Sequence, residues 1–280
     1  EEPPPIIGPA GLIPLALQLE ITPAKTDHLT GEDIKLGFKF KNIVSEPVII
    51  TPFPPAIGVA PLRMDDRKDW KEQVIHSFPA GPGELSLQPG ETAKYTLIWD
   101  QKDDNEQQVI PGWYGIWGEV KTQVADEGIH TQCRSGHFGE VLIQYPQGAM
   151  EKDIELNQSQ TVNGITITLE RVELSPEGAM FYAFTTPPGY SLSQGRALPP
   201  PQWVIHAWAQ YTVDGITKKA GPCDISFQDN GMRLSWGNGG GWDIDKDWLD
   251  PVSSDAEELT FTITKFGDWQ GPWEFHIVKL

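Results

Sequence analysis

The chain has 280 residues, about the length of two domains, and its 28 Gly and 25 Pro argue against a helical bundle because both residues disrupt helix interiors. Its 11 Trp, 11 Phe and 6 Tyr can bury enough surface to exclude a disordered chain, and no apolar run is long enough to insert into a membrane. The net charge is −18, with an acidic excess in both halves, so we expect no basic face and exclude nucleic acid and anionic lipid as partners.

Residues 1–14 form a Pro-rich lead-in that opens with Glu1, Glu2 and three prolines. Such a segment is stiff, extended and solvated. Because the first residue is Glu rather than Met, we expect that a preceding segment was removed. A stiff spacer often separates a folded part from a membrane anchor, so we expect an extracytoplasmic protein, secreted or anchored at the cell envelope. A trimmed cytoplasmic protein is the alternative.

Residues 15–148 show the period-two alternation of β-strands, interrupted by turn residues. In Ile34–Phe40 the apolar residues at every second position share one face. Pro89–Gly90 and Pro111–Gly112 supply turns. The other strands predicted in this half are 16–21, 48–51, 74–78, 93–99, 113–124 and 138–145.

A second series of strands follows the break at Tyr145–Gly148 and occupies residues 149–280. Asn163–Gly164 is typical of a tight hairpin turn, and Asp214–Gly215 predicts another turn. About seven short strands in each half predict an all-β protein of two tandem immunoglobulin-like antiparallel β-sandwiches. The strands predicted in this half are 161–169, 179–185, 204–213, 232–236, 259–264 and 273–280.

Between Leu85 and Val120, a Leu-x-Pro-Gly-Glu turn leads into a strand that ends in Trp99–Asp100, and Pro111–Gly112 starts a strand containing Tyr114. This arrangement resembles the BsuPI-type proteinase-inhibitor domain. The resemblance implies an immunoglobulin-like sandwich and a proteinase inhibitor that acts through a loop. The matched residues are turn and core residues, so no inhibitory residue is implied. The second half resembles immunoglobulin-like modules of bacterial envelope and anti-sigma proteins in its strand pattern.

Four aspartates at close spacing, Asp243, Asp245, Asp247 and Asp250, form the sharpest candidate ligand set. Carboxylates at alternating positions of a loop suit a hard cation, so a calcium site is one interpretation of this loop. Lys246 places a positive charge among these ligands, and no glycine follows the third aspartate. We therefore predict a solvated acidic loop and no cofactor, with calcium binding as the alternative.

Cys133 and Cys223 are the two cysteines, one in each predicted domain. A disulfide between them would suit an oxidising compartment and would join the two sandwiches. Two free thiols are the alternative.

Tryptophans form two candidate binding surfaces. Alternation along 113–117 directs Tyr114 and Ile116 to one side, and Trp113 and Trp117 to the other, as an outward platform. Trp242 and Trp248 flank the acidic loop. Exposed aromatic platforms bind sugars or protein partners. Burial of Trp113 and Trp117 against the second domain is the alternative.

The chain carries no nucleophile elbow, metalloprotease motif or phosphate-binding loop, so we do not expect an enzyme. The predicted function is that of a non-catalytic extracytoplasmic protein whose two immunoglobulin-like modules bind a protein partner. Proteinase inhibition through a loop of the first domain is one alternative. Carbohydrate binding through the exposed tryptophans is another.

Overall fold

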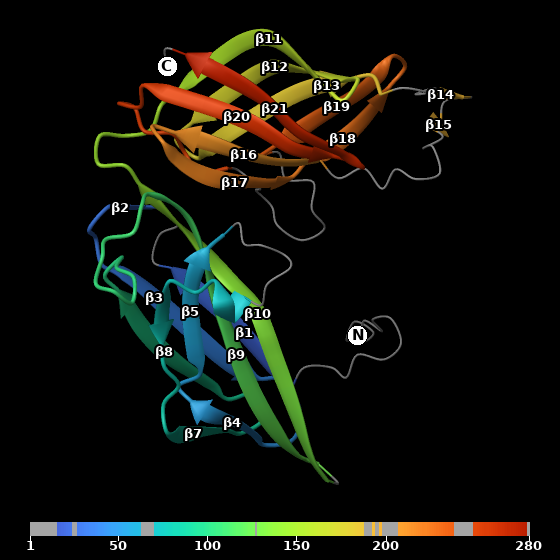
Figure 1. Ribbon diagram of the computed structural model, residues 1–280. Coiled ribbons are helices and arrows are strands. Elements are labelled where there is room, and N and C mark those ends of the chain that lie inside the picture. Colours follow the sequence, from blue (N-terminus) through green and yellow to red (C-terminus); the bar gives the residue numbers. More distant parts are fainter. Residues whose placement is uncertain are drawn as a thin grey trace, which may run out of the picture. The chain divides into compact units, whose positions relative to one another are not determined.

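The computed structural model is all-β, as predicted from the sequence (Figure 1). It describes residues 16–23, 27–62, 70–126, 128–187, 192–193, 196–197, 207–237 and 249–278. The Pro-rich lead-in lies outside these residues. Within them the one helical element is the 3-10 turn η1 (Trp70–Glu72). No helix of the described part is long and apolar enough to cross a membrane.

The chain folds as two compact units. The first comprises Glu1–Thr26, Gly31–Val109 and Tyr114–Val141. The second comprises Asp27–Thr30, Ile110–Trp113 and Leu142–Leu280. The sequence placed the domain boundary at residue 148. In the structure the second unit begins at Leu142 and also includes two short segments from earlier in the chain.

The first unit contains a three-stranded antiparallel sheet of order β1-β3-β8, with β1 at Leu17–Pro23, β3 at Ile34–Asn42 and β8 at Thr92–Trp99. The alternation predicted for residues 34–40 is confirmed. The apolar side chains of β3 are at most 1% exposed and form part of the core. Their neighbours along the strand therefore point to the opposite face of the sheet.

The second sheet has the order β2-β10-β9-β4-β7, and β5 pairs with both β6 and β9. Phe53 lies on this sheet, and its ring centroid is 5.8 Å from those of Phe40 and Tyr95 on the three-stranded sheet. These ring contacts pack the two sheets together. The strands are β2 (Asp27–Leu29), β4 (Val48–Phe53), β5 (Ala56–Pro61), β6 (His76–Phe78), β7 (Gly83–Leu87), β9 (Gly112–Asp126) and β10 (Gly128–Gln144).

The second unit contains a five-stranded sheet of order β11-β12-β13-β19-β18 and a four-stranded sheet of order β17-β16-β20-β21. The predicted hairpin turn at Asn163–Gly164 joins β11 to β12, and both residues have positive φ angles, as this turn requires. The strands are β11 (Lys152–Val162), β12 (Ile165–Ser175), β13 (Gly178–Thr185), β14 (Leu192–Ser193), β15 (Arg196–Ala197), β16 (Ala207–Val213), β17 (Ile216–Pro222), β18 (Asp224–Gln228), β19 (Gly231–Trp236), β20 (Glu258–Phe266) and β21 (Trp269–Val278).

Large aromatic side chains from both sheets fill the core of this unit. Phe181 on β13 stacks on Phe261 of β20, with ring centroids 4.2 Å apart, and Trp236 of β19 meets the same ring edge-on at 5.0 Å. All three side chains are at most 1% exposed. The two sheets therefore face each other across one shared core.

Candidate functional site

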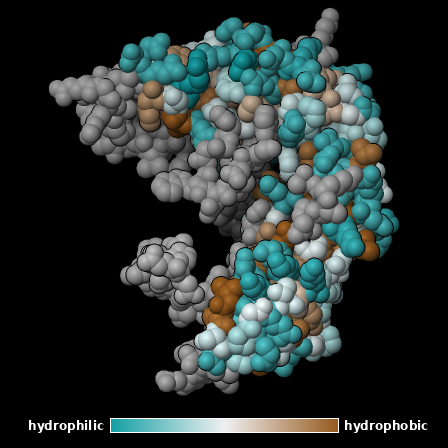
Figure 2. Space-filling view, turned by 180° about the vertical axis from the view of Figure 1, so that it is seen from behind, coloured by the Kyte–Doolittle hydropathy of each residue, from teal (hydrophilic) through white to brown (hydrophobic). Residues whose placement is uncertain are grey.

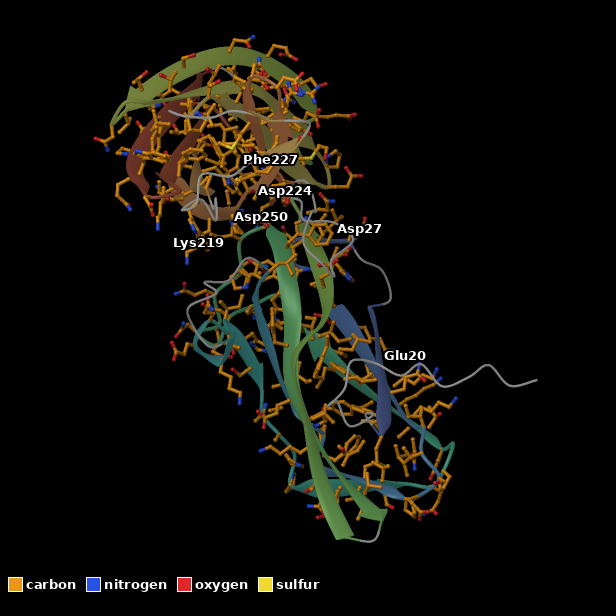
Figure 3. All side chains as sticks on the ribbon, turned by 90° about the vertical axis from the view of Figure 1, so that its right-hand side faces the viewer. Glu20, Asp27, Lys219, Asp224, Phe227 and Asp250 are labelled. Carbon is orange, nitrogen blue, oxygen red and sulfur yellow. The ribbon has the colours of Figure 1, made fainter. Side chains whose placement is uncertain are left out.

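The turn before β9 is held by a hydrogen-bonded ion pair within the second unit. The N–H of Trp113 donates to Oδ1 of Asp250 at 2.7 Å, and Lys218 Nζ lies 3.0 Å from Oδ2 of the same carboxylate (Asp250 is labelled in Figure 3). Lys218 also donates to the carbonyl of Pro111 at 3.1 Å. Gly112 is required here, because a Cβ at this position would lie 2.7 Å from Cγ of Asp250.

Further contacts complete this network. The N–H of Asp250 donates to the hydroxyl of Tyr211 at 3.1 Å, and the indole N–H of Trp113 donates to the carbonyl of Glu177 at 2.8 Å. The predicted platform residue Trp113 is thus half-buried, with its polar atom bonded to the backbone of β-turn 176–177. We call the five residues Pro111, Trp113, Tyr211, Lys218 and Asp250 the Asp250 network.

Trp117 lies further along β9, opposite Gly58 of β5, and is also half-buried. The predicted inward pair is confirmed, since Tyr114 is 7% and Ile116 1% exposed. Trp113 belongs to the second unit and Trp117 to the first. No observation tests sugar binding by these two tryptophans, so it stays a prediction.

Of the candidate calcium ligands, only Asp250 lies among the described residues. Its carboxylate is occupied by Trp113 and Lys218, and the lysine ammonium competes with a cation for the same oxygens. Asp243, Asp245, Asp247, Trp242 and Trp248 lie outside the described residues. In the described part of the chain, no three His, Cys, Asp or Glu side chains gather as a metal-binding group.

The two cysteines lie on different elements. Cys133 is on β10, at a position where the structure does not describe side chains. Cys223 follows β17 as a half-buried free thiol, and its N–H donates to the carbonyl of Ala207 at 3.1 Å. Burial raises the pKa of the Cys223 thiol to about 12.

The raised pKa of the Cys223 thiol predicts that this thiol reacts slowly with alkylating reagents. In a Cys133→Ser variant at pH 8, iodoacetamide should alkylate folded Cys223 about 50-fold more slowly than the urea-unfolded chain, because the lower thiolate fraction is only partly offset by higher nucleophilicity. Below pH 9 the thiol is protonated in both states. As pH rises from 9 through 12, only the unfolded state ionises, so the contribution of this thiol to stability is lost. Equal alkylation rates for folded and unfolded protein would contradict this assignment.

The outward face of the three-stranded sheet carries four lysines, Lys35, Lys39 and Lys41 on β3 and Lys94 on β8. We call this surface the lysine face. Lys39 and Lys94 lie directly opposite each other on neighbouring strands. On the other side of Lys39, Glu20 of β1 forms an ion pair with its Nζ at 2.9 Å (Glu20 is labelled in Figure 3).

The lysine face differs from the expectation that an acidic chain has no basic surface. Net charge averages over the whole sequence, whereas strand alternation collects every second residue of residues 34–41 on one side. Among the described residues of β1, β3 and β8, the only acidic side chain on this face is Glu20. The face is therefore locally positive in a protein that is negative overall.

Few large apolar side chains are exposed in the described part of the chain. On the face drawn in Figure 2, apolar residues form separate small groups between hydrophilic ones. The large exposed apolar residues in the described part are Leu29, Ile43, Ile98, Ile110, Ile216 and Phe227. Within the described part, the lysine face is therefore a more distinct surface feature than any group of exposed apolar side chains.

The acidic loop after β8 is held in one conformation by its own side chains. Oδ1 of Asp103 accepts the N–H groups of Gln107 and Asn105, both at 2.9 Å, and these bonds lower the pKa of its carboxyl group. The indole N–H of Trp99 donates to the carbonyl of Lys102 at 2.9 Å. Gln101 is fully buried and anchors the start of the loop.

Comparison with known proteins finds no matching family model and no matching curated protein. Among solved structures, the Pseudomonas aeruginosa CupB2 chaperone is 10% identical, with 93% of this chain and 100% of that chain covered, at a TM-score of 0.29. The Bacillus subtilis sporulation control protein Spo0M is 12% identical, with 61% and 79% covered, at a TM-score of 0.25.

The Pseudomonas fluorescens alkylpurine DNA glycosylase AlkC is 12% identical, with 46% of this chain and 30% of that chain covered, at a TM-score of 0.27. A β-glucosidase from Listeria innocua is matched over 16% of its own length. The chain thus spans less than a third of either enzyme. These TM-scores are too low to assign a finer fold or a function.

Proposed function

We propose that this chain is a non-catalytic extracytoplasmic protein of two immunoglobulin-like β-sandwich modules, and that its lysine face binds an acidic protein partner. The resemblance of residues 85–120 to the BsuPI-type domain and the two packed sheets of each unit support this architecture. The Pro-rich lead-in supports the location. The observation that carries the function is the concentration of four lysines on one exposed sheet face of an acidic protein.

Like charges directly opposite each other across strands destabilise a sheet, whereas opposite charges in the same positions stabilise it by about 0.2–1 kcal/mol. Lys39 and Lys94 stand in this arrangement, and Glu20 neutralises only one of them. A sheet selected only for stability would gain from an acidic residue in place of Lys94. An acidic partner that contacts both lysines accounts for the unfavourable pair, because it supplies the missing negative charge.

Substituting Lys94→Glu separates binding from stability. We expect the free energy of unfolding to rise by about 0.2–1 kcal/mol, because Lys39 then faces an opposite charge. Binding of a fluorescein-labelled oligoglutamate peptide, measured by anisotropy, should weaken about tenfold or more. Wild-type binding should also weaken as salt is raised from 0.1 M to 1 M, where the Debye length falls from about 10 Å to about 3 Å.

The matched control is Lys265→Glu, which makes the same change in net charge on β20 of the second unit. It should leave peptide binding within about twofold of the wild type. Equal losses in the two variants would show that net charge alone governs binding, and the lysine face would not be the site.

A second candidate function is proteinase inhibition through the loop of residues 100–108. Inhibitory loops must be rigid before they bind, since ordering a loop on binding costs affinity. The two hydrogen bonds to Asp103 and the buried anchor Gln101 provide such rigidity here. These contacts favour the inhibitor function that the BsuPI resemblance implies.

Titration of a panel of secreted and intracellular serine proteases with the full chain tests this candidate. If the loop inhibits, Asp103→Ala should raise the inhibition constant about tenfold, because the loop loses both hydrogen bonds that order it. Asp268→Ala, an exposed turn residue of the second unit, should have no effect. Full protease activity at every ratio of chain to protease would remove this candidate.

A further inference from the structure

An open depression of about 430 Å³ lies on the outer face of the five-stranded sheet, across β11, β12, β13 and β19. This volume is within the range of small-molecule sites. The depression belongs to the second unit, whereas the lysine face and the acidic loop belong to the first. Its lining residues are Glu155, Asn157, Glu170, Arg171, Tyr182 and Arg233.

Two bulges at the same level of the sheet shape the depression. Between β12 and β13, Glu170 is an extra residue with no opposite partner, so both Glu170 and Arg171 turn outward. On β11 the pairing also skips between Glu155 and Gln158, and Asn157 within this bulge has a φ of 51°. Asn adopts the left-handed region more readily than most non-glycine residues, and β-bulges are over-represented next to active sites.

Each arginine of the depression is paired with a glutamate. Arg233 Nε lies 3.2 Å from Oε2 of Glu170. Arg171 forms an ion pair with Glu173 through Nη2, and its guanidinium carbon lies 4.8 Å from the centroid of the Tyr182 ring. The Tyr182 hydroxyl donates to Oε2 of Glu173 at 3.0 Å. Glu173 is not one of the lining residues, and the exposed lining residue Glu155 takes part in no ion pair among the described residues.

This pattern disfavours an anionic ligand. An anion would have to break an existing Arg–Glu pair to be neutralised by either arginine, which leaves the displaced glutamate uncompensated. A neutral ligand rich in hydroxyl groups would leave these pairs intact. A guanidinium has five N–H groups and a carboxylate about four acceptor positions, so the paired residues still offer donors and acceptors to such a ligand.

We propose that the depression formed by Glu155, Asn157, Glu170, Arg171, Tyr182 and Arg233 binds a neutral oligosaccharide. The arginines and Asn157 donate to sugar oxygens, and Glu155 and Glu170 accept from sugar hydroxyls. The predicted sugar-binding function is thereby placed on a different surface from the tryptophans of β9.

The test is isothermal titration of the full chain with maltoheptaose, cellohexaose, xylohexaose and tri-N-acetylchitotriose, with polygalacturonate as the acidic comparison. At least one neutral oligosaccharide should bind. Glu155→Gln, which is nearly isosteric and exposed, and Arg233→Gln should each weaken that binding about tenfold or more. Lys265→Gln on the opposite sheet should leave it unchanged, and unchanged melting temperatures confirm that the variants fold.

Absence of binding by every neutral oligosaccharide would overturn the proposal. So would binding that survives both Glu155→Gln and Arg233→Gln, or binding of polygalacturonate in preference to the neutral sugars. Lys94→Glu should bind the oligosaccharide as the wild type does, so failure at the lysine face and failure at the depression are distinguishable.

Discussion

Replacing Phe261 with alanine should lower the free energy of unfolding by about 3–5 kcal/mol, a large part of the stability of a typical domain. Phe261 is fully buried, and its ring stacks on Phe181 and meets Trp236 edge-on. Because these contacts join the two sheets of the second unit, the substitution opens a cavity between the sheets. Urea denaturation followed by far-ultraviolet circular dichroism measures the loss.

Ile216→Ala is the control for the core prediction. Ile216 is apolar and lies in the same unit, but it is 48% exposed on β17. Its truncation should change the free energy of unfolding by no more than about 0.5 kcal/mol. Similar costs for Ile216→Ala and Phe261→Ala would mean that the two sheets do not share a core.

Replacing Asp250 with alanine should cost about 2–3 kcal/mol, because it removes a charge-assisted hydrogen bond to Trp113 and the counter-charge of Lys218. The Lys218 side chain is only 15% exposed, so water compensates little for the lost carboxylate. Thermal or urea unfolding gives the magnitude. Hydrogen exchange gives the location, since the Trp113 amide should exchange faster in the variant.

Asp268→Ala again serves as the matched control, since Asp268 is an exposed turn residue and its truncation should be nearly neutral. An unchanged exchange rate at Trp113 in Asp250→Ala would contradict the Asp250 network.

The calcium loop has its own test. A fall in melting temperature upon adding calcium chelator to the wild type, but not to Asp245→Asn, would support calcium binding by this loop.

The all-β class and many strands could be predicted because alternation is a local property of the sequence. Residues 34–41 show this well, since their apolar positions are buried and their lysines form most of the lysine face. The same alternation that located the core could have revealed this basic surface. The net charge did not indicate it, because a sum over all residues does not show on which face of a sheet each charged side chain lies.

Other features depend on pairing between distant segments and could not be read from one strand at a time. β10 begins at Gly128, ten residues before the strand predicted at 138–145, whereas β9 (Gly112–Asp126) nearly matches the strand predicted at 113–124. β11 was mostly missed because its polar sequence lacks a clear apolar face. The depression arises from bulges, which shift the register between neighbours, and Asp250 meets Trp113 only through the fold.

Lysine acetylation footprinting tests the central claim most directly. The full chain is treated with a trace of an acetylating reagent, with and without the oligoglutamate peptide, and each lysine is quantified by mass spectrometry. Binding at the lysine face predicts that the peptide protects Lys35, Lys41 and Lys94, while Lys152 and Lys265 react at the same rate as before. Equal protection of all five lysines, or protection of Lys152 and Lys265 alone, would contradict it.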